Sequence, residues 1–198
     1  MKFDHSLPLE YSTQQNHLNI LGFWIFIGAE IMLFATLFAS YFTLVDRTGR
    51  GPTGAEIFDI IPVLIETIVL LTSSFTIGLA VHATRIGHKK ATMAFIAATL
   101  LLGLIFLGVE IYEFIHYVHV GASIQTSAFT AILLTTLGTH GAHVTFGLFW
   151  GLSILLQVRK QGLTPETANK SFIFSLYWHF LDVVWIFIFS FIYLKGMM

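Results

Sequence analysis

Long stretches that are almost free of charged residues alternate with short polar ones along this chain. Residues 18–45, 60–84, 91–109, 126–158 and 171–194 each contain at most one Asp, Glu, Lys or Arg. An α-helix rises 1.5 Å per residue, so about 20 residues cross the hydrocarbon core of a bilayer. The pattern therefore predicts an all-α polytopic membrane protein. Its expected form is a bundle of five transmembrane helices, at approximately 18–45, 58–84, 91–119, 126–158 and 171–195.

The faces of these predicted helices support the same interpretation. Apolar residues occur on all sides of each helix, whereas an amphipathic surface helix has a single apolar stripe. The alternating pattern of a membrane β-barrel strand is missing from the sequence. With no internal repeat and no soluble segment of domain size, we expect one membrane domain over residues 1–198.

The basic residues predict how the bundle is oriented. Five spans place the N-terminal tail and the second and fourth connections on one side of the membrane. That side holds Lys2, Arg85, Lys89, Lys90, Arg159, Lys160 and Lys170, and the other side holds Arg47, Arg50 and Lys195. Cytoplasmic loops are enriched in Lys and Arg, so the N-terminus is predicted in the cytoplasm and the C-terminus outside.

Composition excludes several kinds of chemistry. Hydrophobic residues make up 56% of the chain and charged residues 11%, against about 25% charged residues in soluble domains. The net charge of −1 gives no basic surplus for binding nucleic acid. The absence of cysteine excludes disulfides, thiolate nucleophiles and thiolate-bound metals or iron–sulfur clusters in this chain.

A set of polar residues is predicted to meet near the middle of the bilayer. At 1.5 Å per residue, Glu30 lies about 18 Å along the first helix, and His140 and His143 lie roughly 20–25 Å along the fourth. His179 and Asp182 lie about 10–17 Å into the fifth. Unpaired polar groups are costly at this depth. We therefore expect these five residues to form a buried network that fastens the fourth helix to its neighbours.

A second polar set lies toward the outer ends of the second and third helices. Glu110 and Glu113 are one helical turn apart at a membrane boundary, so we expect them to titrate as a coupled pair. With Glu66 and His116 they are candidates for proton or lipid contacts. At the inner ends, clustered basic residues attract anionic lipid headgroups. That expectation covers Arg85, Lys89, Lys90, Arg159 and Lys160.

The segment GTHGAHVTFG, residues 138–147, allows two interpretations of its histidines. They could ligate haem or a metal, but ligands also need partners and a supporting shell of hydrogen bonds. A membrane histidine that bonds a neighbouring helix is the commoner case. Gly138, Gly141, Gly147 and Gly151 would let such a helix approach closely. We therefore expect no haem, metal or other cofactor in this chain.

Several motifs together resemble the subunit III family of haem–copper terminal oxidases. They are GTHGAHVTFG and YWHFLDVVWIFIFSFIYL, with GFWIFIGAEIMLFATLFASYF, ETIVLLTSS and GVEIYEF in the earlier spans. The resemblance covers all five spans and is nearest to the five-helix form of bacterial quinol oxidases. One departure is Glu66, which stands where the longer mitochondrial form has Asn.

The resemblance implies a non-redox accessory subunit of an oxygen-reducing, proton-pumping complex in the bacterial plasma membrane. Such a subunit packs on catalytic subunit I, which holds the haem and copper. It assembles with subunit II and a small subunit IV, binds phospholipid, and supports proton uptake and complex stability. Two alternatives remain open from the sequence: subunit III of a cytochrome c oxidase, and a small transporter or proton channel that acts alone.

Overall fold

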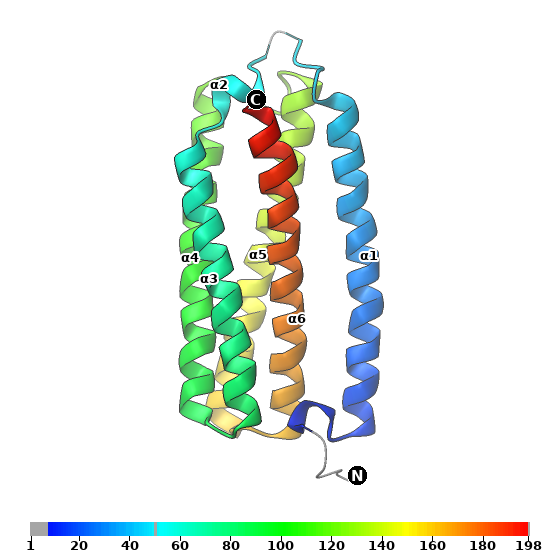
Figure 1. Cartoon of the computed structure of the whole chain (residues 1–198), viewed down its shortest axis with the longest axis vertical. Helices are drawn as coiled ribbons and strands as arrows, with labels where there is room; N and C mark the ends of the chain where they lie inside the picture. The colour runs from blue at the N-terminus through cyan, green and yellow to red at the C-terminus, as the bar shows by residue number, and fades with distance from the viewer. Residues whose placement is uncertain (1–7, 50, 198) are drawn as a thin grey trace.

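Five long helices run side by side and form nearly the whole structure (Figure 1). The computed structural model describes residues 8–49 and 51–197. Its long helices are α1 (Gln14–Leu44), α3 (Ile60–Arg85), α4 (Lys89–His119), α5 (Ala128–Gln161) and α6 (Pro165–Ile188). A π-helical segment, Phe189–Leu194, continues α6 toward the C-terminus. All five are long and apolar enough to cross a membrane, which confirms the predicted all-α fold.

The structure extends several helices beyond their predicted ends and adds two short elements. The helix predicted to start at residue 171 begins at Pro165, and α5 continues to Gln161 instead of ending at 158. The predicted ends were too short because the prediction followed the apolar residues alone. A helix can continue through the polar headgroup layer, where its residues are charged or polar. The short elements, not predicted from sequence, are the 3₁₀ turn Leu9–Tyr11 and α2 (Gly54–Ile57).

Side chains cap the starts of four of the long helices. Thr13 accepts a hydrogen bond from the Asn16 backbone at 3.2 Å, and Asp59 accepts from that of Ile61 at 3.1 Å. Ser127 and Thr164 accept in the same way from Thr130 and Thr167. Each cap satisfies one of the backbone N–H groups left free at a helix start, which matters near a membrane.

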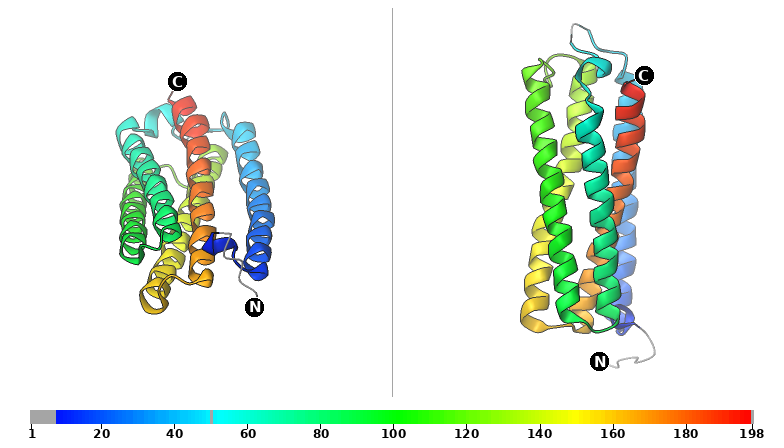
Figure 2. Two further views of the ribbon diagram at one scale, coloured as in Figure 1. Left: turned by 60° about the horizontal axis from the view of Figure 1, so that its bottom comes forward. Right: turned by 60° about the vertical axis from the view of Figure 1, so that its left-hand side comes forward.

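Helix α6 lies between α3 and α1 (Figure 1 and the left-hand view of Figure 2). It packs against α1, α3 and α5, while α4 packs against α3 and α5. The two ends of the chain lie at opposite ends of the bundle (Figure 1). The connections after α3 and α5 therefore share one end with the start of α1. Lys2 and Arg50, used in the orientation argument, lie outside the described residues.

The bundle buries two tryptophans of α6 and exposes other large apolar side chains on its outer surface. Trp178 and Trp185 are fully buried. By contrast, Ile25 and Phe149 are each 71% exposed. Exposed apolar surface on this scale is typical of helices that face lipid or another subunit.

Two glycines of α4 provide a matched test of this packing. A Cβ on Gly103 would lie 2.8 Å from the Trp178 ring, whereas one on Gly108 would meet nothing within 4 Å. We expect Gly103→Ala to destabilise the protein by about 1–3 kcal/mol through overpacking, and Gly108→Ala to leave it stable. Unfolding in detergent, followed by circular dichroism, measures both. Equal midpoints for the two variants would contradict the packing shown here.

Candidate functional site

His143 joins α5 to α1 through a mid-span contact with Glu30. The Nε2 atom of His143 lies 3.1 Å from Oε2 of Glu30. Its Nδ1 lies 2.7 Å from the carbonyl oxygen of Thr139, and since that oxygen can only accept, Nδ1 carries a hydrogen. The pair is then either imidazolium with carboxylate or neutral imidazole with carboxylic acid. Both forms have zero net charge, which suits a site inside a membrane.

His140 is oriented differently and does not share in this contact. It is fully buried, and within residues 8–49 and 51–197 neither ring nitrogen has a hydrogen-bond partner. Its ring centroid lies 5.7 Å from that of Phe106 and 5.4 Å from that of Trp185. The physical reason is that residues three apart on a helix differ by about 60° in direction. His143 therefore faces α1, while His140 faces aromatic groups of α4 and α6.

His179 and Asp182 lie on the α3 side of α6. Nδ1 of His179 is 2.7 Å from the hydroxyl of Ser74 on α3. Asp182 lies beside the same Ser74 hydroxyl and beside His179, and its Oδ1 is shielded from the surface without a partner. Of the five residues expected to form one network, the structure thus links only Glu30 and His143 directly. The others are held by different neighbours.

Three carboxyl groups are buried between α3, α4 and α6. Glu66, Glu110 and Glu113 are each at most 4% exposed. Glu113 accepts hydrogen bonds from the hydroxyls of Tyr117 at 3.1 Å and Tyr193 at 2.8 Å. For Glu66 and Glu110, no described residue supplies a hydrogen bond. The Glu110 carboxyl packs directly on Gly141, where an added Cβ would lie 2.5 Å from Oε2.

His116 lies apart from this buried cluster, on the surface. It is exposed, and with Asp59 and Glu113 it lines a cleft of about 70 Å³ near the start of α3. Glu113 is therefore the one acid of the cluster that lines this cleft. The structure brings Glu66, Glu110 and Glu113 together as a buried group and leaves His116 at its rim.

Hydrogen bonds from aromatic residues of α6 also cross between helices, and sequence reasoning missed them. The indole N–H of Trp178 donates to the Ser73 hydroxyl at 2.9 Å, and that of Trp185 donates to the Thr67 hydroxyl at 3.0 Å. The spacing of these residues in the sequence was the available signal. Trp178 and Trp185 are seven residues apart on α6, and Ser73 and Thr67 are six apart on the antiparallel α3, so both indoles can reach a hydroxyl group.

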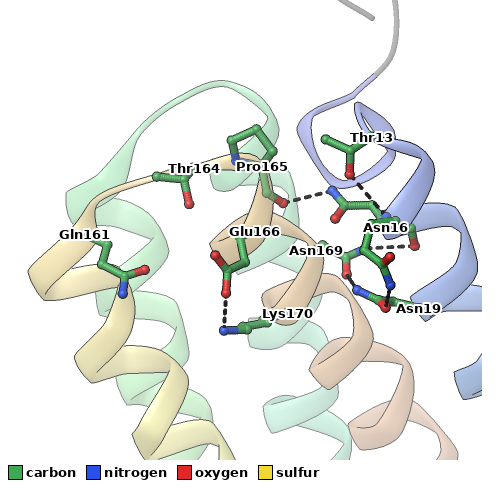
Figure 3. A pocket seen from close by; sticks show the side chains of 10 residues that line it. Thr13, Asn16, Asn19, Gln161, Thr164, Pro165, Glu166, Asn169 and Lys170 are labelled. Atoms are coloured by element: carbon green, nitrogen blue, oxygen red, sulfur yellow. Dashed lines mark hydrogen bonds and ion pairs between the residues drawn. The ribbon is translucent and has the colours of Figure 1, made fainter. Parts of the chain in front are cut away.

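A polar pocket of about 620 Å³ opens at the end of the bundle where α1 starts, which we call the inner end because its connections are predicted in the cytoplasm (Figure 3). It lies between the starts of α1 and α6 and the end of α5. The Lys170 ammonium donates to Glu166 at 2.7 Å and to Gln157 at 2.9 Å. Asn16 donates to the carbonyl of Pro165 at 3.1 Å. The pocket thus combines a cation, an anion and several amides.

An apolar cleft of about 520 Å³ lies farther along α1 and α5. Aromatic residues line it: Phe23, Phe26, Phe146, Phe149 and Trp150. Asn19 of the polar pocket is one helical turn before Phe23 on α1. The polar pocket and the aromatic cleft therefore follow one another along the same side of the bundle.

The basic residues predicted at the headgroup layer lie at the inner end, but two have protein partners. The Arg85 guanidinium lies 2.7 Å from the buried Glu10 carboxylate. Lys89 donates to the carbonyl of Arg159 at 2.9 Å. Lys90, Arg159 and Lys160 are exposed. In the part of the chain that the structure describes, no three His, Asp or Glu side chains are arranged to hold a metal ion.

Comparison with known proteins identifies the family. The profile described as "Cytochrome c oxidase subunit III" matches residues 10–197. The chain belongs to the cytochrome c oxidase subunit III family. This confirms the resemblance drawn from the five spans, and it makes the chain a subunit of an oxidase complex in the membrane.

Relatives from Bacillus and Staphylococcus cover nearly the whole chain. Quinol oxidase subunit 3 of Bacillus spizizenii is 57% identical over 190 residues, 96% of this chain and 93% of that protein. Cytochrome c oxidase subunit 3 of a Bacillus species (strain PS3) is 47% identical over 191 residues, 96% and 92%. A probable quinol oxidase subunit 3 of Staphylococcus saprophyticus is 46% identical over 192 residues, 96% and 94%.

The contact between Glu30 and His143 makes a measurable prediction about helix attachment in this family member. We expect Glu30→Leu and His143→Phe each to destabilise the chain, because each leaves one polar group unpaired. The double variant should be less destabilised than the sum, by about 0.6–1.7 kcal/mol, the range for hydrogen bonds between membrane helices. Unfolding in mixed micelles gives the four free energies. Strict additivity would show that the two groups do not interact.

Proposed function

We propose that this chain is subunit III of a bacterial quinol oxidase and carries no redox centre of its own. The observation that carries the proposal is the 57% identity to a quinol oxidase subunit 3 across 96% of the chain. The oxygen chemistry, with its haem and copper, would belong to catalytic subunit I. Two histidines of this chain support the absence of a redox centre here. His143 contacts Glu30, and His140 is enclosed by aromatic rings.

The relative from strain PS3 supports a second candidate, subunit III of a cytochrome c oxidase. The two candidates differ in the electron donor of the complex. Oxygen consumption driven by a quinol or by reduced cytochrome c separates them. We favour the quinol oxidase because two of the three relatives above carry that name and one is the most similar of the three.

As an accessory subunit, the chain would pack on subunit I and assemble with subunit II and a small subunit IV. It would support proton uptake and the stability of the complex. Its exposed apolar faces support such assembly, since Ile25, Phe75 and Phe149 are each at least 67% exposed. Lipid covers those parts of the surface that subunits leave free.

The inner pocket and the aromatic cleft support the binding of a phospholipid. Lys170 offers a cation for a phosphate, and Glu166 beside it offers an anion for an ammonium group. The start of α6 at Pro165 adds the partial positive charge of a helix N-terminus. Because the aromatic cleft continues along α1 and α5, an acyl chain would lie against Phe23 and Trp150.

The orientation we propose places the inner end of the bundle in the cytoplasm of a bacterial plasma membrane. Among the described residues, that end carries Arg85, Lys89, Lys90, Arg159, Lys160 and Lys170, and the other end carries Arg47 and Lys195. The excess of basic residues supports a cytoplasmic N-terminus and a C-terminus outside.

Purification in mild detergent tests both the assembly and the lipid site. We expect the tagged chain to copurify with a haem-bearing complex that consumes oxygen with quinol. Lys170→Met should lower bound phospholipid per haem, since one basic contact contributes about 1 kcal/mol, or roughly fivefold in affinity. Visible spectra, oxygen consumption and phosphorus analysis are the measurements.

Lys160→Met is the matched control, because Lys160 is exposed at the same end but does not line the pocket. It should retain lipid as the wild-type chain does. A chain that purifies without haem-bearing partners would refute the proposed function. Equal phosphorus in all three complexes would refute the lipid site alone.

Single cysteines test the orientation, since the chain has no cysteine of its own. His88 and Asp46 are exposed residues in connections at opposite ends of the bundle. In intact cells, a membrane-impermeant maleimide should label Asp46→Cys and spare His88→Cys until the cells are opened. The reverse labelling would show that the bundle is inserted the other way round.

A further inference from the structure

Three carboxyl groups lie close together toward the outer end of the bundle, the end opposite the start of α1. Glu66 belongs to α3, and Glu110 and Glu113 belong to α4. We call these three residues the acid group. Glu66 lies within electrostatic range of the other two. Because each of the three is at most 4% exposed, the acid group lies inside the protein rather than in the headgroup layer.

No cation of the described chain balances the acid group. Among residues 8–49 and 51–197, none of the ion pairs includes Glu66, Glu110 or Glu113. Unpaired charges inside a membrane are costly, and neighbouring carboxylates also repel one another. A buried carboxyl group without a cation can lose its charge by binding a proton. Proton binding is therefore the means by which the acid group can lower its charge.

Glu66 and Glu110 are closed off from water. All four of their carboxyl oxygens are shielded from the surface, and no described residue forms a hydrogen bond with them. On one side, the Glu110 carboxyl packs on the backbone of Gly141 of α5. A proton that enters or leaves either acid must therefore pass through a neighbouring group that is open to water.

Glu113 is open to water through one of its two oxygens. Its Oε2 accepts hydrogen bonds from the hydroxyls of Tyr117 and Tyr193, and such bonds favour the ionised form of a carboxyl group. Its Oε1 makes no hydrogen bond with a described residue and is open to the surface. Glu113 lines the cleft of about 70 Å³ together with Asp59 and His116. A water molecule needs only about 10–15 Å³ of such space, so water can reach Oε1.

Other titratable groups surround the acid group. Asp59, just before α3, lies within electrostatic range of Glu113, and Tyr193 belongs to the π-helical segment after α6. On α5, His140 is next to Gly141, but its ring packs against aromatic rings and neither nitrogen has a hydrogen-bond partner among the described residues. Asp59 and His116 line the cleft and so lie between the acid group and water.

We propose that Glu66, Glu110 and Glu113 bind protons as one site and exchange them with water at the outer end of the bundle through Glu113. A hydronium ion in the cleft gives its proton to Oε1 of Glu113 and leaves as water. When a shielded acid has lost its proton, Glu113 passes its own to it, and release reverses these steps. The inference goes beyond the proposed function, because it applies whichever donor reduces the oxidase.

Infrared spectroscopy of the purified complex tests the site. The C=O stretch of a protonated carboxyl group shifts when deuterium replaces its hydrogen, so transfer to heavy water measures exchange. We expect Glu66→Gln and Glu110→Gln each to remove part of this signal. Glu113→Gln keeps an acceptor for the two tyrosines but cannot carry a proton. It should slow exchange at least about a hundredfold, as expected for the loss of a positioned proton carrier.

Glu30→Gln is the matched control, because it makes the same change at a mid-span acid outside the acid group. It should leave the exchange rate near that of the wild type, and tryptophan fluorescence confirms that each variant is folded. An unchanged carboxyl signal in both Glu66→Gln and Glu110→Gln would overturn the proton site. An unchanged exchange rate in Glu113→Gln, or an equal slowing in Glu30→Gln, would overturn the role of Glu113.

A bulky thiol label tests the cleft as the entrance, since the chain has no cysteine of its own. His116→Cys places the label in the cleft, whereas His119→Cys places it on an exposed residue that does not line the cleft. We expect the label at residue 116 to slow exchange as Glu113→Gln does, and the label at 119 to leave it unchanged. Equal exchange rates in the two labelled complexes would overturn this entrance.

Discussion

Lipid chains offer no hydrogen-bond partners, and this constraint governs the arrangement of the five helices. A polar side chain within a span is costly unless the protein shields it from lipid or supplies a partner. Helix α6 and the π-helical segment after it supply three such donors, from Trp178 to Ser73, from Trp185 to Thr67 and from Tyr193 to Glu113. The same side chains form the aromatic core, so packing and hydrogen bonding fix α6 in one position.

The acids inside the bundle show the same constraint in different forms. Glu30 and His143 neutralise each other across two helices. Glu113 is held by two tyrosine hydroxyls, and the Glu110 carboxyl fits against the bare backbone of Gly141. Asp182 lies beside the Ser74 hydroxyl and His179, where α3 and α6 pack together.

The spans could be predicted from sequence because the length of an apolar run follows directly from the thickness of a bilayer. Depth along each helix could also be estimated, and the structure places Glu30 and His143 3.1 Å apart. Helix ends were less accurate, as at Pro165, because charged and polar residues continue the helix into the headgroup layer.

Partners within the site could not be predicted, because they depend on the rotation of each helix about its axis. His140 and His143 lie one turn apart, yet one faces aromatic rings and the other faces Glu30. The indole hydrogen bonds to Ser73 and Thr67 depend on a register between α3 and α6 that no local pattern encodes. The polar pocket likewise needs three helix ends that are far apart in the sequence.

The central claim is that Glu30 and His143 neutralise each other at mid-span and so hold α1 to α5. An electron cryo-microscopy structure of the assembled complex measures this most directly. The account predicts a ring nitrogen of His143 within about 3.5 Å of the Glu30 carboxyl group. A Glu30 carboxyl group that faces lipid, with the His143 ring turned away from it, would contradict the account.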